Sequence, residues 1–155
     1  MKKQITLLLS GVLLSGCLLA TPAHADPYLN GVWSGAYDYG DQIGPNAVWF
    51  SVVFETEGDE VKGRSLEMQT FGREPSVGLS AELKGVASGD IISLVKKYDG
   101  SGGQSHSVHL RLSYDADGNL TGEWMLDPQT KGRVELFKLG FTEAELDAFA
   151  EDDYD

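Results

Sequence analysis

Most of the chain repeats one pattern, in which a run of alternating apolar and polar residues is followed by a turn rich in Gly, Asp or Asn. Val108, Leu110 and Leu112, for example, alternate with His109 and Arg111. Alternation with a period of two places the apolar side chains on one face of a β-strand. The pattern predicts eight strands, near residues 30–39, 47–57, 60–71, 79–88, 91–99, 106–114, 120–127 and 132–139.

The links between these runs are short and carry residues that suit tight turns. Glu57-Gly58-Asp59, Gly89-Asp90 and the segment 115–119 supply Gly, Asp and Asn, which tolerate the backbone of a hairpin. No long amphipathic helix separates the runs, and parallel strands would need such crossovers. The sequence therefore predicts an all-β, antiparallel, up-and-down sheet in which each strand pairs with the next.

Glycines inside the predicted strands indicate that this sheet curls into a closed barrel. They occur in Gly31–Gly35 and at Gly63, Gly85 and Gly122. Glycine weakens a flat strand, so its recurrence favours sharp bends or bulges, which a small barrel requires. A β-sandwich with bent strands would show similar signs and remains the alternative.

The third predicted strand changes its pattern partway along. Val61 lies in one phase of the alternation, whereas Leu66 and Met68 lie in the other. One extra residue in a strand shifts every later side chain to the opposite face. We therefore expect a bulge near Gly63.

Alternation alone does not say whether the apolar face lies inside the barrel or outside it. A barrel of the outer-membrane class turns its apolar residues toward lipid and its polar residues inward. The many long charged side chains on the polar face, such as Lys84 and Arg111, and the acidic C-terminus favour a soluble barrel with an apolar interior.

The N-terminus predicts export. Residues 1–25 begin with Lys2 and Lys3, continue with an apolar stretch and end in Ala23-His24-Ala25, which together are typical of a secretory signal. Cleavage after Ala25 would release a periplasmic or secreted protein. The alternative is a membrane-anchored lipoprotein, because Leu14-Ser15-Gly16-Cys17 is similar to a bacterial lipobox whose Cys17 is lipidated. In that case the membrane is a partner through Cys17.

The part after the strands has a different character. Thr142 and Glu145 suit a capping box, and Phe141 and Leu146 suit a hydrophobic staple, so residues 141–155 predict a short helix and an acidic tail. The expected organisation is a signal peptide (1–25), a β-barrel domain (26–140) and this terminal segment.

Charge and cysteine content exclude some functions. Loss of Lys2 and Lys3 with the signal takes the formal net charge from −12 to −14. Binding to nucleic acid is disfavoured, because phosphate attraction needs a cationic surface. Cys17 is the single cysteine, so the barrel domain has no disulfide and no thiol nucleophile.

The Gly31-Val32-Trp33 triplet, the eight-strand meander, the Leu120–Trp124 strand and the trailing helix together resemble the calycin superfamily, which includes lipocalins, fatty-acid-binding proteins and avidins. The resemblance implies that Trp33 plugs the closed end of the barrel. It also implies that a basic residue of a late strand, Arg133 or Lys138, lies over this ring. It suggests a ligand-binding tendency without identifying a ligand.

Four aromatic residues are the candidate ligand contacts, namely Trp33, Tyr37, Tyr114 and Trp124. A barrel of eight strands can hold one small molecule, although the same rings are also expected simply to fill the core. We expect no metal site, because His106 and His109 lie three apart on a strand and therefore on opposite faces. No catalytic residues and no cofactor are predicted, and we do not expect an enzyme.

The sequence thus predicts an exported binding protein for a small, mostly apolar ligand. The alternative is an envelope interaction or inhibitor protein with a filled barrel, whose acidic surface and long loops at Gly40–Asn46 and Gly72–Gly78 bind a protein partner.

Overall fold

The structure is a computed structural model that describes residues 24–72 and 74–140. In this part of the chain eight strands follow one another: β1 (Gly31–Asp38), β2 (Val48–Glu57), β3 (Glu60–Glu67), β4 (Leu79–Ser88), β5 (Ile91–Tyr98), β6 (Ser107–Tyr114), β7 (Leu120–Asp127) and β8 (Thr130–Leu139). Two single-turn 3-10 helices accompany them, η1 (Pro27–Leu29) before β1 and η2 (Ser101–Gly103) between β5 and β6.

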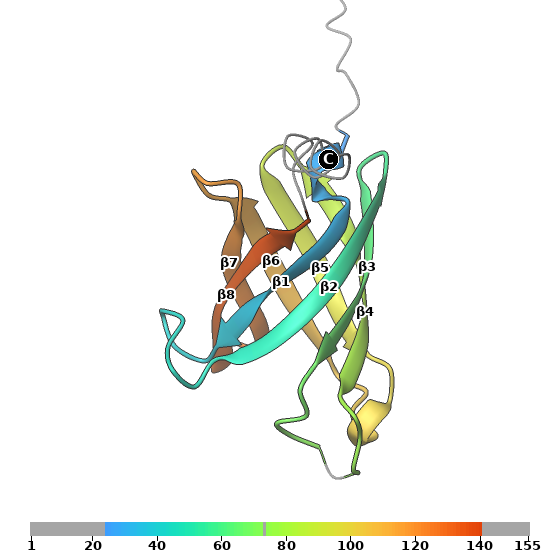
Figure 1. Cartoon of the computed structure of the whole chain (residues 1–155), viewed down its shortest axis with the longest axis vertical. Helices are drawn as coiled ribbons and strands as arrows, with labels where there is room; N and C mark the ends of the chain where they lie inside the picture. Colours follow the sequence, from blue (N-terminus) through green and yellow to red (C-terminus); the bar gives the residue numbers. More distant parts are fainter. Residues whose placement is uncertain (1–23, 73, 141–155) are drawn as a thin grey trace, which may run out of the picture.

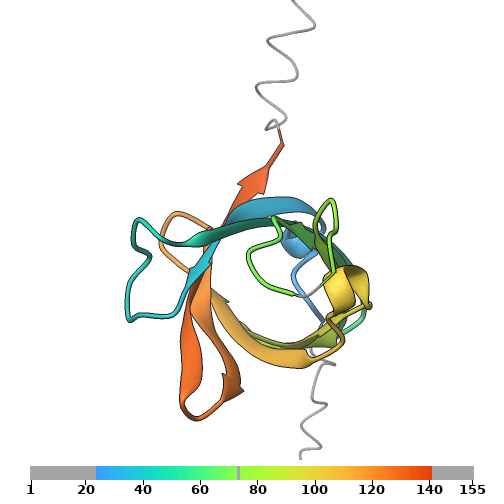
Figure 2. The same cartoon turned by 90° about the horizontal axis from the view of Figure 1, so that it is seen from below.

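The strands form a closed antiparallel barrel in which every strand pairs with its neighbours in sequence (Figure 1). Closure is made by β1 and β8, whose paired residues run from Val32 with Leu139 to Asp38 with Arg133. The view along the barrel shows the complete ring (Figure 2). The predicted up-and-down barrel is therefore confirmed, and the sandwich alternative is wrong.

The apolar face of the sheet lies inside the barrel. Trp33, Phe54, Leu83 and Leu120 are all at most 1% exposed, and they belong to one core cluster that spans the barrel. Charged side chains such as Lys84 lie on the outer face. Burial of this large apolar area is the main favourable contribution to folding.

The bulge expected near Gly63 is wrong. Pairing of β2 with β3 continues without a shift from Phe50 with Glu67 to Glu57 with Glu60. The strand keeps its phase, so Ser65 and Glu67 are buried, whereas Leu66 and Met68 are 58% and 68% exposed. The apolar pattern changes face because polar side chains occupy the interior positions here, and the backbone does not shift. The strand also ends at Glu67, four residues earlier than predicted.

Interior glycines mark places where neighbouring strands come very close. A Cβ atom at Gly85 would lie 1.9 Å from the carbonyl oxygen of Ser93, and one at Gly122 would lie 2.0 Å from that of Arg111. No larger residue fits these positions without moving backbone. The register shift among the described strand pairs falls elsewhere, between Met125 and Asp127.

The two predicted long loops lie at the same end of the barrel, together with η2 (Figure 1). At the other end, η1 lies just before the start of β1 (Figure 1). The backbone N–H of Ala25 donates a hydrogen bond to the carbonyl of Gly58 there, and Ala25 is buried. The two ends of the barrel are therefore built differently: the long loops and η2 lie at one end, and η1 lies at the other.

Several predictions concern residues outside the described ranges. These are most of the signal sequence, Cys17, and the short helix and acidic tail at 141–155. The described part of the chain contains no helical segment that could span a bilayer.

Candidate functional site

The end of the barrel beside η1 is closed by aromatic packing around Trp33. This side chain is fully buried, and its Nε1 donates a hydrogen bond of 2.9 Å to the carbonyl of Leu29. The Lys138 ammonium lies over the ring of Tyr28, 4.1 Å from its centroid, and 5.7 Å from that of Trp33. It also donates a hydrogen bond to the carbonyl of Tyr28. Of the two basic residues considered from the sequence, Lys138 is thus the one over the tryptophan.

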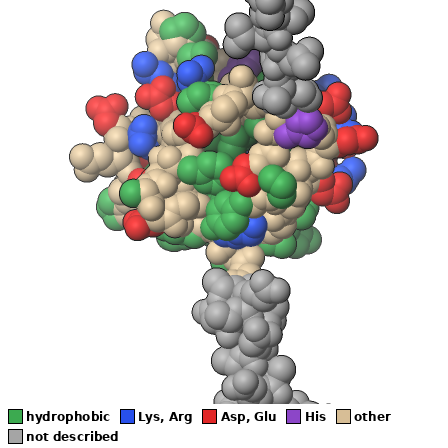
Figure 3. Space-filling view, turned by 90° about the horizontal axis from the view of Figure 1, so that it is seen from above, with side chains coloured by type: hydrophobic (Ala, Val, Ile, Leu, Met, Phe, Trp, Pro, Cys, Tyr) green, Lys and Arg blue, Asp and Glu red, His purple; other side chains and the backbone are tan. Residues whose placement is uncertain are grey.

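Tyr114 belongs to the same closed end. Its ring lies 6.4 Å from that of Trp33 and 5.8 Å from that of Tyr28, measured between centroids. Burial, followed by the nearby Asp26, raises the pKa of Tyr114 to about 12. Seen from above, this end shows hydrophobic side chains toward its middle and charged ones mostly around its rim (Figure 3). Trp33 and Tyr114, two of the four candidate ligand contacts, therefore seal the barrel at this end.

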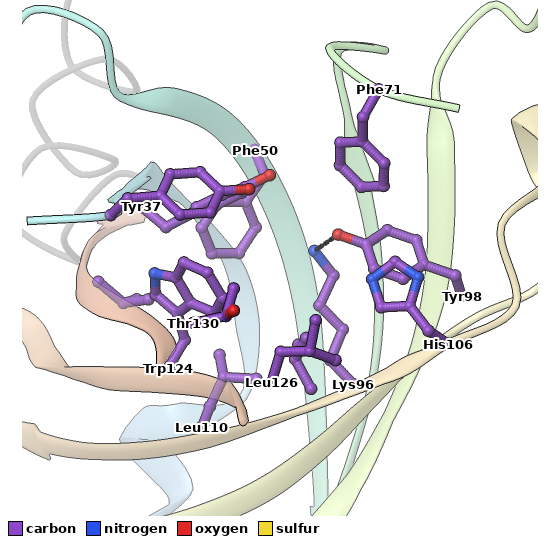
Figure 4. Close-up of a pocket in the computed structure, with 13 residues that line it drawn as sticks. Tyr37, Phe50, Phe71, Lys96, Tyr98, His106, Leu110, Trp124, Leu126 and Thr130 are labelled. Carbon is purple, nitrogen blue, oxygen red and sulfur yellow. Dashed lines mark hydrogen bonds between the residues drawn. The ribbon is translucent and has the colours of Figure 1, made fainter. Parts of the chain in front are cut away.

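The opposite end contains a cavity of about 290 Å³ (Figure 4). Tyr37 and Trp124, the other two candidates, line it. The described lining residues are mostly aromatic or aliphatic and come from the barrel wall and its loops: Tyr37, Tyr39, Phe50, Phe71, Lys96, Tyr98, His106, Val108, Leu110, Trp124, Leu126, Thr130 and Val134. The four predicted residues are thus divided between the two ends of the barrel.

Trp124 is held at the wall of the cavity by both polar and aromatic contacts. Its Nε1 donates a hydrogen bond of 2.9 Å to the carbonyl of Asp38, which connects β7 to the end of β1. Its ring meets Tyr37 and Tyr39 edge to face, with centroids 5.6 Å and 4.9 Å apart. Gly132 allows this arrangement, since a Cβ there would lie 2.9 Å from the indole nitrogen.

A buried ion pair borders the cavity. Lys96 Nζ lies 2.5 Å from Glu67 Oε2, and the two side chains are 4% and 0% exposed. Two tyrosines complete the cluster around the carboxylate, since Tyr98 and Tyr37 donate hydrogen bonds of 2.7 Å and 3.3 Å to Glu67 Oε1. Buried charges are tolerated when they are paired and hydrogen-bonded in this way.

The surroundings of the pair alter its proton equilibria. Burial lowers the pKa of Lys96, and the charge of Glu67 and its hydrogen bond oppose this effect. Burial and then the same carboxylate raise the pKa of Tyr98 and of Tyr37 well above 10. Both phenols therefore keep their protons at neutral pH and remain donors to Glu67.

Rings enclose the ammonium on the side of the cavity. Lys96 Nζ lies 4.7 Å from the ring centroid of Tyr98, 5.1 Å from that of Phe50 and 5.6 Å from that of Tyr37. Figure 4 shows the ammonium pointing into the space between these rings, with its hydrogen bond to the Tyr98 hydroxyl. Each ring face attracts the cation and helps to compensate its burial.

His106 forms the outer part of this wall. Its ring lies 4.7 Å from that of Tyr98 and 5.9 Å from that of Phe71. Burial, and next the charge of Lys96, lower the pKa of His106, so the imidazole is neutral at neutral pH. His109 lies on the exposed face of β6, and no three His, Cys, Asp or Glu side chains of residues 24–72 and 74–140 are grouped to hold a metal ion.

Sequence reasoning missed the two charged residues of this site. A signal was present, because Lys96 shares its phase with Ile92, Leu94 and Tyr98 on β5, all of which are buried. A charged residue on the apolar phase of a strand indicates an interior polar group. On β3 the same signal was present, because Glu67 lies on the same face of the strand as the buried Val61. The change of pattern in this strand was attributed to a bulge instead.

Comparison of the chain with models of protein families, with curated proteins and with solved structures found no match. The fold and site define the class: an eight-stranded, antiparallel, up-and-down barrel, sealed at one end and hollow at the other.

Proposed function

We propose that this protein is a calycin-like binding protein that holds one small, mostly apolar ligand in the cavity at the open end of its barrel. The observation that carries the proposal is the cavity itself, about 290 Å³ and walled by aromatic and aliphatic side chains. Ligand sites in proteins are concave and mostly apolar, with a few polar groups that orient the ligand, and run from about 300 to about 1,000 Å³. This cavity suits a ligand at the small end of that range.

The arrangement of the barrel supports binding at this end only. The closed end is filled by Trp33, η1 and Lys138, so its packing does not need a bound ligand. At the other end, Tyr37 and Tyr98 both line the cavity, and Figure 4 shows open space between their rings. A rigid wall with a preformed hollow lowers the entropy lost on binding.

The protein is proposed to act after export, in the periplasm or outside the cell, or tethered to the membrane through Cys17. The alternative function, a filled barrel whose loops bind a protein partner, is less favoured. A filled barrel would leave no hollow of this size at its mouth.

Fluorescence titration with the neutral probe N-phenylnaphthylamine tests the proposal. We expect saturable probe binding that a tryptophan at Thr130, a lining residue at the mouth, blocks by filling the hollow. Gln129→Trp is the matched control, because Gln129 is the exposed neighbour of Thr130 and does not line the cavity. The proposal fails if no saturable binding occurs, or if Thr130→Trp and Gln129→Trp bind the probe equally well.

A further inference from the structure

The hydrogen bonds of the buried ion pair leave one defined group facing the cavity. A lysine ammonium has three N–H donors. Lys96 uses one on Glu67 Oε2 at 2.5 Å and a second on the Tyr98 hydroxyl at 3.2 Å. One N–H donor is left, and the ammonium that carries it borders the cavity with aromatic rings around it (Figure 4).

The carboxylate, by contrast, is turned away from the hollow. Glu67 has no exposed side-chain surface, and it is absent from the residues that line the cavity. Its oxygens already accept hydrogen bonds from Lys96, Tyr98 and Tyr37. A molecule in the cavity therefore meets the positive end of the ion pair and not its negative end.

The charge of Lys96 is nevertheless already balanced. Among the lining residues that the structure describes, Lys96 is the one lysine or arginine, and the lowered pKa of His106 leaves that ring neutral. A carboxylate ligand would bring a second negative charge close to Glu67 and would lose its own hydration. A neutral oxygen can accept from Lys96 without either penalty.

The geometry points to a ligand with a flat, apolar body and one neutral oxygen acceptor, such as a ketone, aldehyde or ester carbonyl, which binds the third N–H of Lys96. This inference rests on the proposed function and adds the ligand class. The rings of Tyr37, Phe50 and Trp124 suit a flat body, because aromatic rings pack well in offset or edge-to-face contact.

Three probes of similar size test the inference on the full chain by calorimetry: methyl naphthyl ketone, isopropylnaphthalene and naphthoate. We expect the ketone to bind about tenfold or more tightly than the hydrocarbon, the gain typical of a hydrogen bond from a charged donor. We expect naphthoate to bind more weakly than the ketone. The series needs no variant, so it decides the question even where substitutions impair folding.

Variants then locate the effect. Lys96→Met combined with Glu67→Gln removes the donor without leaving an unpaired charge, and it should abolish the preference for the ketone. Lys97→Met, the next residue on β5 and exposed, should preserve it.

The outcomes separate this inference from the function on which it rests. Equal binding of ketone and hydrocarbon overturns the ligand class while leaving a binding cavity, and tightest binding of naphthoate overturns it in favour of an anion site. Absence of binding by all three probes overturns the proposed function as well.

Discussion

Replacing Lys96 with methionine removes one charge from a buried pair and leaves the other without its partner. Lys96 and Glu67 are 4% and 0% exposed, with 2.5 Å between Nζ and Oε2. At this distance their attraction is about 7 kcal/mol for an effective dielectric constant of ~20. Desolvation of the two ions costs several kcal/mol each, so the intact pair contributes little net stability. Each single substitution, however, loses the attraction and keeps the penalty on the remaining ion.

We therefore expect Lys96→Met to lower the free energy of unfolding by about 3–5 kcal/mol. Glu67→Gln should have a similar effect, because it leaves the ammonium of Lys96 without its counter-ion. The double variant should lose at least about 2 kcal/mol less than the sum of the two singles, since each substitution removes the penalty caused by the other.

Urea unfolding followed by far-UV circular dichroism and tryptophan fluorescence measures these differences in a double-mutant cycle. Lys97→Met is the matched control, and this exposed neighbour should change the free energy by less than about 0.5 kcal/mol. The reasoning is refuted if Lys96→Met loses less than about 1 kcal/mol, or if the two single effects simply add.

Three further predictions concern the barrel wall, its closed end and the division between its ends. Gly122→Ala should destabilise the barrel by about 1–3 kcal/mol or more in urea unfolding, because its Cβ would lie 2.0 Å from a carbonyl oxygen. Gly40→Ala is the control and should be tolerated, because a Cβ there would lie 3.8 Å from its nearest neighbouring atom. Equal losses of unfolding free energy in the two variants would contradict the close approach of the strands at Gly122. The pKa of Tyr114, raised to about 12, means that the native phenol keeps a proton that the unfolded chain releases above about pH 10, so unfolding free energy should fall as pH rises there. Tyr114→Phe should reduce this fall between about pH 10 and 12, and an unchanged slope would refute the assignment. Trp124→Leu should weaken probe binding in fluorescence titrations, because Trp124 lines the cavity. Trp33→Phe should lower stability and leave the affinity for the probe unchanged. The reverse result would mean that the probe binds at the end closed by Trp33.

The strands themselves were predictable from local pattern. Six of the eight agree with the structure within one residue at each end, for example 79–88 and 120–127. The third strand was predicted four residues too long, and the eighth was predicted to begin two residues late, at 132 rather than Thr130. Asp127 explains the latter, because its carboxylate accepts hydrogen bonds from the backbone of Gln129 and Thr130 and closes a tighter turn.

The site was predicted only in part. Alternation identified Trp33, Tyr37, Tyr114 and Trp124 as interior residues, but it carries no information on height along the barrel axis. Height depends on the stagger between strands, which places Tyr37 opposite Val134 and Trp33 opposite Lys138. This stagger is a property of the closed ring and puts the four aromatics at different ends.

Alternation and turn residues were therefore sufficient to determine the all-β class and the order of the strands, since these depend on neighbours in the chain. They also gave the buried face of the strands other than β3, whose second half buries Ser65 and Glu67 rather than Leu66. Tertiary structure alone decided that Glu67 and Lys96 meet inside. Twenty-nine positions separate them in sequence, and they lie on β3 and β5, which pair with β4 and not with each other. Only the packing of the curled sheet brings Lys96 Nζ and Glu67 Oε2 to 2.5 Å. In isolation neither charge is expected in the interior, because burial of a charge is costly unless its partner is present.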